Sequence, residues 1–107
     1  MTIYYFGFKR TAVPTDMPVY DVRDITNPFN QANSDIEREA LVLAHPLALE
    51  LVNAICAKVR LSNLTELAIG CTWGKHRSKA IATMAAKFLG MEALPLSERP
   101  NAIRSIR

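Results

Sequence analysis

Residues 65–90 read TELAIGCTWGKHRSKAIATMAAKFLG, and this stretch decides the fold class. The apolar run at 65–70 predicts a strand, and residues 77–89 place apolar side chains at helical spacing. Gly90 is the stop expected at the carboxyl end of that helix. The loop between strand and helix is rich in glycine, hydroxyl and basic residues. A strand, a short loop and a helix in this order are typical of a parallel α/β sheet.

The flanking sequence extends the same alternation. Segments 2–8 and 19–22 carry the aromatic and β-branched residues of strands, and a turn is predicted from Asn27 to Asn33. Ser34 and Glu37 have the spacing of a helix capping box before a helix at 35–44, and Pro46 suits the first turn of the next helix. We expect that helix to turn one apolar stripe toward the core: Leu47, Leu51, Ala54, Ile55 and Val59. Residues 91–107 receive no assignment. The fold class is therefore a small layered α/β domain with a largely parallel sheet, forming one domain over residues 1–107.

Composition narrows the class of protein. Half of the 107 residues are hydrophobic, which is typical of a globular protein. The net charge of +3 favours an anionic partner. The sequence lacks the dense basic stripe that is typical of a protein that binds duplex nucleic acid. Two cysteines and two isolated histidines give neither a disulfide framework nor a zinc site, so no metal and no cofactor are expected. The N-terminus lacks a signal-peptide layout and no apolar run approaches membrane-spanning length, so we expect a cytoplasmic protein without a membrane partner.

The loop at 70–78 is the candidate site because ligands of parallel sheets bind beyond the carboxyl ends of the strands. The helix that follows offers unpaired amides and the positive end of its dipole, and Gly74 lets the backbone approach a ligand closely. If the three strands are parallel, Lys9, Arg10 and Arg23 come to the same edge. The predicted anion-binding residues are Thr72, Trp73, Gly74, Lys75, His76, Arg77 and Ser78 of the loop, with Arg10 and Arg23.

Within this set, Arg77 is the residue we expect to grip an anion directly, because its planar fork matches two oxygens. Trp73 is suited to stacking on a sugar or a base, or to packing on protein. Arg23 has a second interpretation, an internal ion pair with a neighbouring aspartate. A further alternative is that the loop has only a structural role and binds anions incidentally.

Two catalytic loops are tested against this sequence. The Walker A pattern fails, because only three residues separate Gly70 from Gly74, where the pattern needs four, and His76 follows Lys75. The cysteine phosphatase pattern C-x5-R-[S/T] is met by Cys71, Arg77 and Ser78, and a helix N-terminus would stabilise a thiolate. No spacing singles out the general acid that a phosphatase requires. A cysteine-dependent phosphatase is therefore the alternative to a non-catalytic binding module.

Three segments resemble one family in the same order. Residues 67–78 resemble the A-I-G-C-T-G-G-x-H-R-S signature of the C-terminal domain of the RNase adapter protein RapZ family. Phe6 to Lys9 resembles its F-G-F-K segment, and Asp21 to Arg23 with Asn27-Pro28 resembles its D-x-R-F-x-x-N-P segment. The resemblance spans roughly residues 4 to 90. Trp73 replaces a glycine, Arg10 stands where many members have histidine, and the segment between Asn27 and Thr65 is shorter.

This resemblance implies a stand-alone version of that C-terminal domain, without the family's N-terminal P-loop domain. In the family, the domain is linked to an amino-sugar phosphate and to small regulatory RNA, and it oligomerises. The resemblance therefore implies a non-catalytic, regulatory binding module for a phosphorylated small molecule, a phosphosugar-like anion, with RNA contact and homo-oligomerisation as further expectations.

Overall fold

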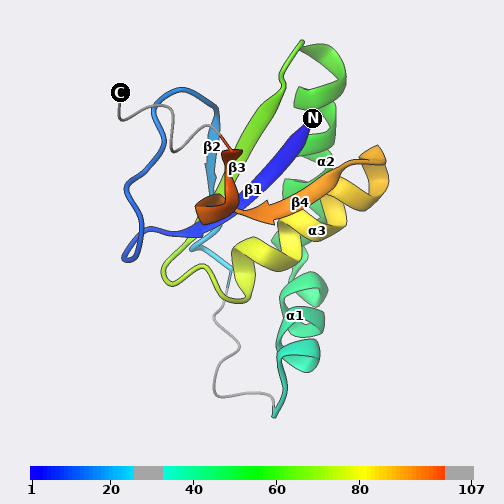
Figure 1. Cartoon of the computed structure of the whole chain (residues 1–107). Helices are drawn as coiled ribbons and strands as arrows, with labels where there is room; N and C mark the ends of the chain where they lie inside the picture. Colours follow the sequence, from blue (N-terminus) through cyan, green and yellow to red (C-terminus); the bar gives the residue numbers. More distant parts are fainter. Residues whose placement is uncertain (26–32, 101–107) are drawn as a thin grey trace.

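The computed structural model describes residues 1–25 and 33–100 of the chain. The turn predicted at Asn27-Pro28 lies outside the described residues. The described residues form four strands, three α-helices and one short 3-10 helix (Figure 1). The elements are β1 (Thr2–Gly7), β2 (Val19–Asp21), α1 (Asp35–Ala44), α2 (Pro46–Leu61), β3 (Glu66–Cys71), α3 (Arg77–Leu89), β4 (Glu92–Pro95) and η1 (Leu96–Glu98).

The four strands form one sheet in the order β2-β3-β1-β4, and every neighbouring pair is parallel. The prediction of a largely parallel sheet is confirmed. β1 and β3 are the central strands and pair over six residues each, from Thr2 opposite Glu66 to Gly7 opposite Cys71. Because all strands point the same way, their carboxyl ends meet at one edge.

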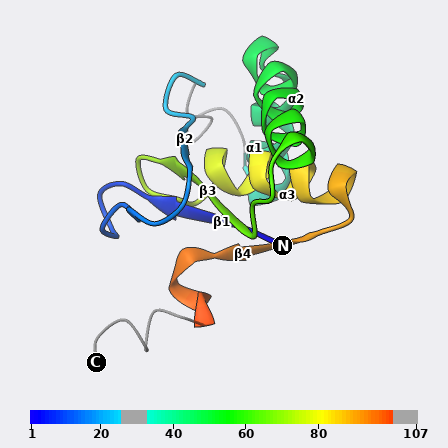
Figure 2. The ribbon, with the colours of Figure 1, turned by 90° about the horizontal axis from the view of Figure 1, so that it is seen from above.

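The three helices gather on one side of the sheet, as Figure 2 shows. Side chains of a strand alternate between faces, so Ile3 and Leu67 point into the core under the helices, whereas Tyr4 and Phe6 point to the opposite face. The chain moves across the sheet in one direction from β2 to β3 to β4, and both connections carry helices. The step from β1 to β2 runs the other way. Since parallel connections share one handedness, this step covers the opposite face, where Phe8 and Met17 pack on Tyr4 and Phe6.

The local helix signals predicted from sequence are confirmed. The Ser34 side chain accepts a hydrogen bond from the Glu37 amide at 3.2 Å, which caps α1. Pro46 occupies the first turn of α2, and Gly90 ends α3 with a left-handed φ of 66°. Among the described residues no single helix is long and apolar enough to cross a membrane, although α1 and α2, which meet at 81°, satisfy length and composition as a bent pair.

The predicted core stripe of α2 is partly wrong. Ile55 and Val59 are buried, but Leu47 is 37% exposed and Ala54 also faces solvent. The side chains that actually face the core are Ala48, Val52, Ile55, Cys56 and Val59. Apolar residues surround most of this helix, so sequence periodicity alone allowed two nearby faces. The contacts of α2 with α3 decide which face is buried.

The segment after Gly90, which received no assignment from sequence, forms a strand and a short 3-10 helix within residues 92–98. Glu92–Pro95 forms the edge strand β4, which pairs with β1. A four-residue strand that contains proline lacks a recognisable alternation, yet proline is tolerated at a sheet edge. The segment is held by Arg99, whose guanidinium bonds the Glu66 carboxylate at 2.6 and 2.9 Å and the Asp16 carboxylate at 2.7 and 3.1 Å.

These bonds make the tail sensitive to acid. Hydrogen bonds from Arg99 lower the pKa of both Asp16 and Glu66 below their usual values. Groups with a lowered folded-state pKa contribute stability above their unfolded pKa of roughly 4, and this contribution disappears as the pH falls through the folded value. Burial and a hydrogen bond with Glu66 raise the pKa of Tyr4 beside them.

We therefore expect Arg99→Gln to lower the free energy of unfolding at neutral pH by roughly 1–2 kcal/mol, the range for partly screened bonds to charged groups. The variant should also lose less stability than the wild type between about pH 5 and pH 2. Urea unfolding across this range measures both effects. Arg60→Gln, which changes an exposed arginine at the end of α2, is the control with the same charge change. If the free energy of unfolding fell equally with acid in the wild type and in Arg99→Gln, the proposed role of the Arg99 ion pairs would be contradicted.

Candidate functional site

The loop after β3 lies directly on the end of β1. Pairing of these strands continues past their ends, because the amides of Phe8 and Lys9 donate to the carbonyls of Cys71 and Thr72 at 2.8 and 3.0 Å. A Cβ on Gly7 would lie 2.3 Å from the Trp73 carbonyl carbon, and a Cβ on Gly74 would lie 2.5 Å from the Gly7 amide nitrogen. Gly74 also has a φ of 75°, which side chains disfavour. The loop can take this position only because both residues are glycine.

A chain of polar contacts fixes the loop from beneath. The Gly74 amide donates to the Cys71 thiol at 3.2 Å, and the thiol lies 3.2 Å from the Ser78 hydroxyl. That hydroxyl in turn donates to the Phe6 carbonyl at 3.3 Å. Cys71 is 2% exposed and Ser78 is fully buried. The cysteine and serine therefore connect β3, the loop, α3 and β1 under the protein surface.

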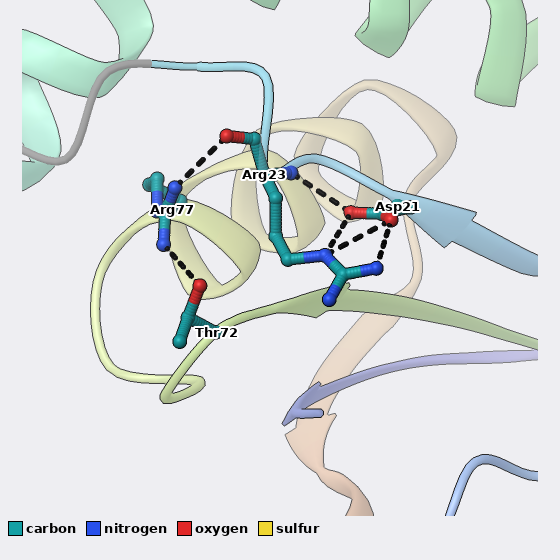
Figure 3. Close-up of polar contacts among 4 residues, drawn as sticks. All are labelled: Asp21, Arg23, Thr72 and Arg77. Carbon is teal, nitrogen blue, oxygen red and sulfur yellow. Dashed lines mark hydrogen bonds and ion pairs between the residues drawn. The ribbon is translucent and has the colours of Figure 1, made fainter. Parts of the chain in front are cut away.

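Arg77 connects the loop to the end of β2. Its guanidinium donates to the Arg23 and Ile25 carbonyls, both at 3.1 Å, and to the Thr72 hydroxyl at 2.9 Å. Figure 3 shows this side chain between the two segments. Arg77 is 7% exposed, and its hydrogen bonds to neighbours use neutral acceptors, which do not cancel its charge. Within the described part of the chain no carboxylate pairs with it, so the edge keeps a positive charge at this point.

Arg23 behaves differently. Its guanidinium turns back to the Asp21 carboxylate at 2.6–3.0 Å (Figure 3). The guanidinium Cζ lies 4.1 Å from the centre of the Phe8 ring. The hydrogen bonds from Arg23 hold the pKa of Asp21 below its usual value. The internal ion pair that the sequence left open is thus formed. It compensates most of the charge that Arg23 brings to the edge.

The exposed cations of the edge come from the end of β1 and from the loop tip. Lys9, Arg10 and Lys75 face solvent, and Lys9 Nζ lies 5.5 Å from the centre of the Trp73 ring. Trp73 is 50% exposed. The sequence predicted Lys9 at this edge beside Arg10, but Lys9 was not among the residues predicted to bind the anion.

His76 is the N-cap residue of α3, but its side chain makes no capping hydrogen bond. The ring is 9% exposed, Nε2 lies 3.8 Å from an Asp35 carboxylate oxygen, and the buried Nδ1 has no hydrogen-bond partner among the described residues. The first amides of α3, at Arg77, Ser78 and Lys79, have no acceptor within the helix by its geometry. Amides and the helix dipole at this point favour an anion.

The structure thus brings together all nine residues predicted from sequence, but with different exposure. Trp73, Lys75, Arg10 and Arg23 reach the surface, Thr72 and Gly74 are half-buried, and His76, Arg77 and Ser78 are buried. Direct contact between Arg77 and a ligand stays a prediction. Among residues 1–25 and 33–100, no three histidine, cysteine or acidic side chains are grouped as a metal ion would need. The arrangement presents cations and amide donors at one edge, which suits an anion.

The sequence is similar to proteins of one known family. The family model described as the RapZ C-terminal domain matches residues 1–100. A protein of Rubrobacter xylanophilus named nucleotide-binding protein is 35% identical over 84% of this chain, which covers 34% of that relative. Proteins with the same name from Synechococcus sp. and Thermotoga sp. strain RQ2 are 33% and 28% identical over 84% and 97% of this chain, which covers 31% and 42% of them. The chain spans about a third of the length of these relatives.

The contact between the two glycines gives a stability prediction. Gly74→Ala adds a Cβ against the Gly7 backbone at a positive φ, so we expect a loss of about 3 kcal/mol or more in the free energy of unfolding. Gly90→Ala is the matched control, because Gly90 also has a positive φ but a Cβ there meets open space. The control should lose only about 1 kcal/mol. Urea unfolding of both variants measures the difference, and equal losses would show that the close approach costs nothing.

Proposed function

This chain belongs to the RapZ C-terminal domain family, and from that premise we propose that it is a non-catalytic binding module for a phosphorylated small molecule. The ligand is a phosphosugar-like or nucleotide-like anion that binds at the carboxyl edge of the sheet. The relatives named nucleotide-binding proteins are about three times longer than this chain, so their names support the proposal only in its general sense.

One observation carries the proposal: the uncompensated positive charge where β1 and the β3 loop end. Lys9, Arg10 and Lys75 are exposed there, and Arg77 lies beneath with neutral hydrogen-bond partners. The amides at the start of α3 add donors of the kind that bind phosphate at helix N-termini. Lysine and arginine differ in the way they bind phosphate, and the edge offers both a point charge and a planar fork.

The buried polar contacts favour binding over catalysis. In a cysteine phosphatase, the thiolate must reach the phosphorus atom and the arginine must face the same phosphate. Here the Cys71 thiol is covered and already bonded to Gly74 and Ser78, and the Arg77 guanidinium is directed to Arg23, Ile25 and Thr72. These contacts support a packing role for Cys71 and a positioning role for Arg77.

The proposal also includes RNA contact, homo-oligomerisation and a cytoplasmic location. The exposed cations of one copy are few, so a single copy would neutralise few RNA phosphates and bind weakly at physiological salt. A symmetric oligomer would repeat the edge and raise the avidity without new contacts. Arg99, the one tail arginine within the described residues, is engaged with Asp16 and Glu66. Arg104 and Arg107 lie outside the described residues.

We expect inorganic phosphate to raise the melting temperature above that in chloride of equal ionic strength. A ligand at a hundred times its dissociation constant adds about 2.7 kcal/mol to the free energy of unfolding. Lys75→Gln should weaken phosphate binding several-fold while leaving the unliganded melting temperature unchanged, because this side chain is exposed. Lys87→Gln, at the far end of α3, is the charge-matched control and should bind like the wild type. Equal phosphate shifts in all three proteins would refute the site.

We also expect no hydrolysis of an aryl phosphate or of ATP. The sequence lacks the Walker A spacing, and Cys71 is only 2% exposed. A continuous chromogenic assay on the purified chain tests this. Turnover that disappears in a folded Cys71→Ser variant would overturn the binding-module proposal in favour of the phosphatase.

A further inference from the structure

A pocket of about 340 Å³ opens beside the anion-binding edge, between the ends of β1 and β4. It is lined by Tyr5, Phe6, Gly7, Arg10, Thr11, Trp73, Gly74, Pro95, Leu96 and Ser97. Its walls therefore come from the end of β1, the loop after β3 and the tail segment that Arg99 holds in place. Pockets of this size are in the range that encloses a small organic ligand.

The lining has the chemistry of a site for a flat heteroaromatic ring. Trp73 offers a half-exposed aromatic ring, and Phe6, Pro95 and Leu96 add apolar atoms to a lining that also contains the polar side chains of Thr11 and Ser97. No carboxylate and no carboxamide side chain is among the lining residues, although such groups are the usual partners of the many hydroxyls of a free sugar. The charged lining residue, Arg10, presents hydrogen-bond donors only, which suit ring acceptors such as the N7 and O6 of guanine.

The pocket is continuous with the positive edge. Gly74 belongs both to the pocket wall and to the loop before α3, and Lys75 follows it in the chain. Lys9 Nζ lies 5.5 Å from the centre of the Trp73 ring. A molecule with a ring against Trp73 would therefore place a phosphate attached to that ring system near several cations.

We propose that this pocket binds the base of a nucleotide, stacked on Trp73, with the nucleotide phosphate held at the Lys9, Arg10 and Lys75 edge. This inference rests on the proposed function, because the phosphate site is the same, and it adds the class of ligand and the residue that selects it. Base–aromatic stacking tolerates any base, since every base has a π-face.

The nucleotide has two sources, free in solution or at the end of an RNA. A second hollow of about 540 Å³ shares Thr11, Leu96 and Ser97 with the first and continues toward Asp16 and Arg99. It offers room for atoms beyond one nucleotide. The shared chemistry, a base on Trp73 and a phosphate at the edge, is the same for both sources.

The test compares ligands that differ only in the base. We expect GMP to bind the wild-type chain about tenfold more tightly than ribose 5-phosphate, which carries the phosphate without a ring to stack. Trp73 is the single tryptophan of the sequence, so GMP should also quench its fluorescence, whereas ribose 5-phosphate should not. Calorimetric titration of Trp73→Ala should show that the advantage of GMP over ribose 5-phosphate is lost. Trp73→Phe should restore part of the difference in affinity between GMP and ribose 5-phosphate.

Phe88→Ala is the matched control, because it removes an exposed aromatic ring from the far end of α3 and should leave both affinities unchanged. Equal affinity of the wild type for GMP and ribose 5-phosphate overturns the stacking site but leaves the phosphate site standing. Failure of the wild type to bind either ligand overturns the proposed function and this inference together. A 5′-phosphorylated pentanucleotide identifies the source: a further gain that depends on Trp73 supports an RNA end, and no gain supports the free nucleotide.

Discussion

The close approach of two backbones, at Gly7 and Gly74, is the constraint on which the rest of the site depends. A Cβ at either position would lie 2.3–2.5 Å from a backbone atom of the other segment, well inside any real contact. Without this approach the loop after β3 would stand away from β1, and the bonds from Phe8 and Lys9 to Cys71 and Thr72 would not form. The cations that follow β1 and those of the loop would then lie on separate parts of the surface.

Some charged side chains of this edge hold the structure together, and others face solvent. Arg77 is buried and holds β2 to the loop through carbonyl and hydroxyl groups, whereas Arg23 is exposed but compensated by Asp21. Burial of an arginine is tolerable when neutral acceptors satisfy its donors. Such acceptors leave the charge in place, so Arg77 contributes to the potential of the edge without meeting solvent. Lys9, Arg10 and Lys75 are left as the cations that reach solvent directly.

The face of the sheet opposite the helices is closed by the irregular segment at 8–18 and by the tail. Each segment alone would contribute little to the stability of the fold, because it buries few apolar side chains. Arg99 joins them by bonding Asp16 of the first segment and Glu66 at the start of β3. The pocket beside Trp73 takes one wall from this tail, so a structural ion pair at one end of the sheet supports a cavity at the other.

Local signals in the sequence determined much of this protein. The strand–loop–helix unit at 65–90, the caps at Ser34, Pro46 and Gly90, and the choice of a parallel sheet all follow from residue patterns within a few positions of each other, where short-range sterics and hydrogen bonds dominate. The same patterns located the positive loop and predicted that Arg10 and Arg23 would meet it. Only the tertiary structure decided which apolar face of α2 is buried, that residues 92–95 form an edge strand, and that Arg77 is turned inward while Trp73 and Lys75 face out. These properties depend on partners distant in the chain, such as α3 for α2, or Arg23 and Ile25, more than fifty residues away, for Arg77. No local pattern encodes a contact at such a separation.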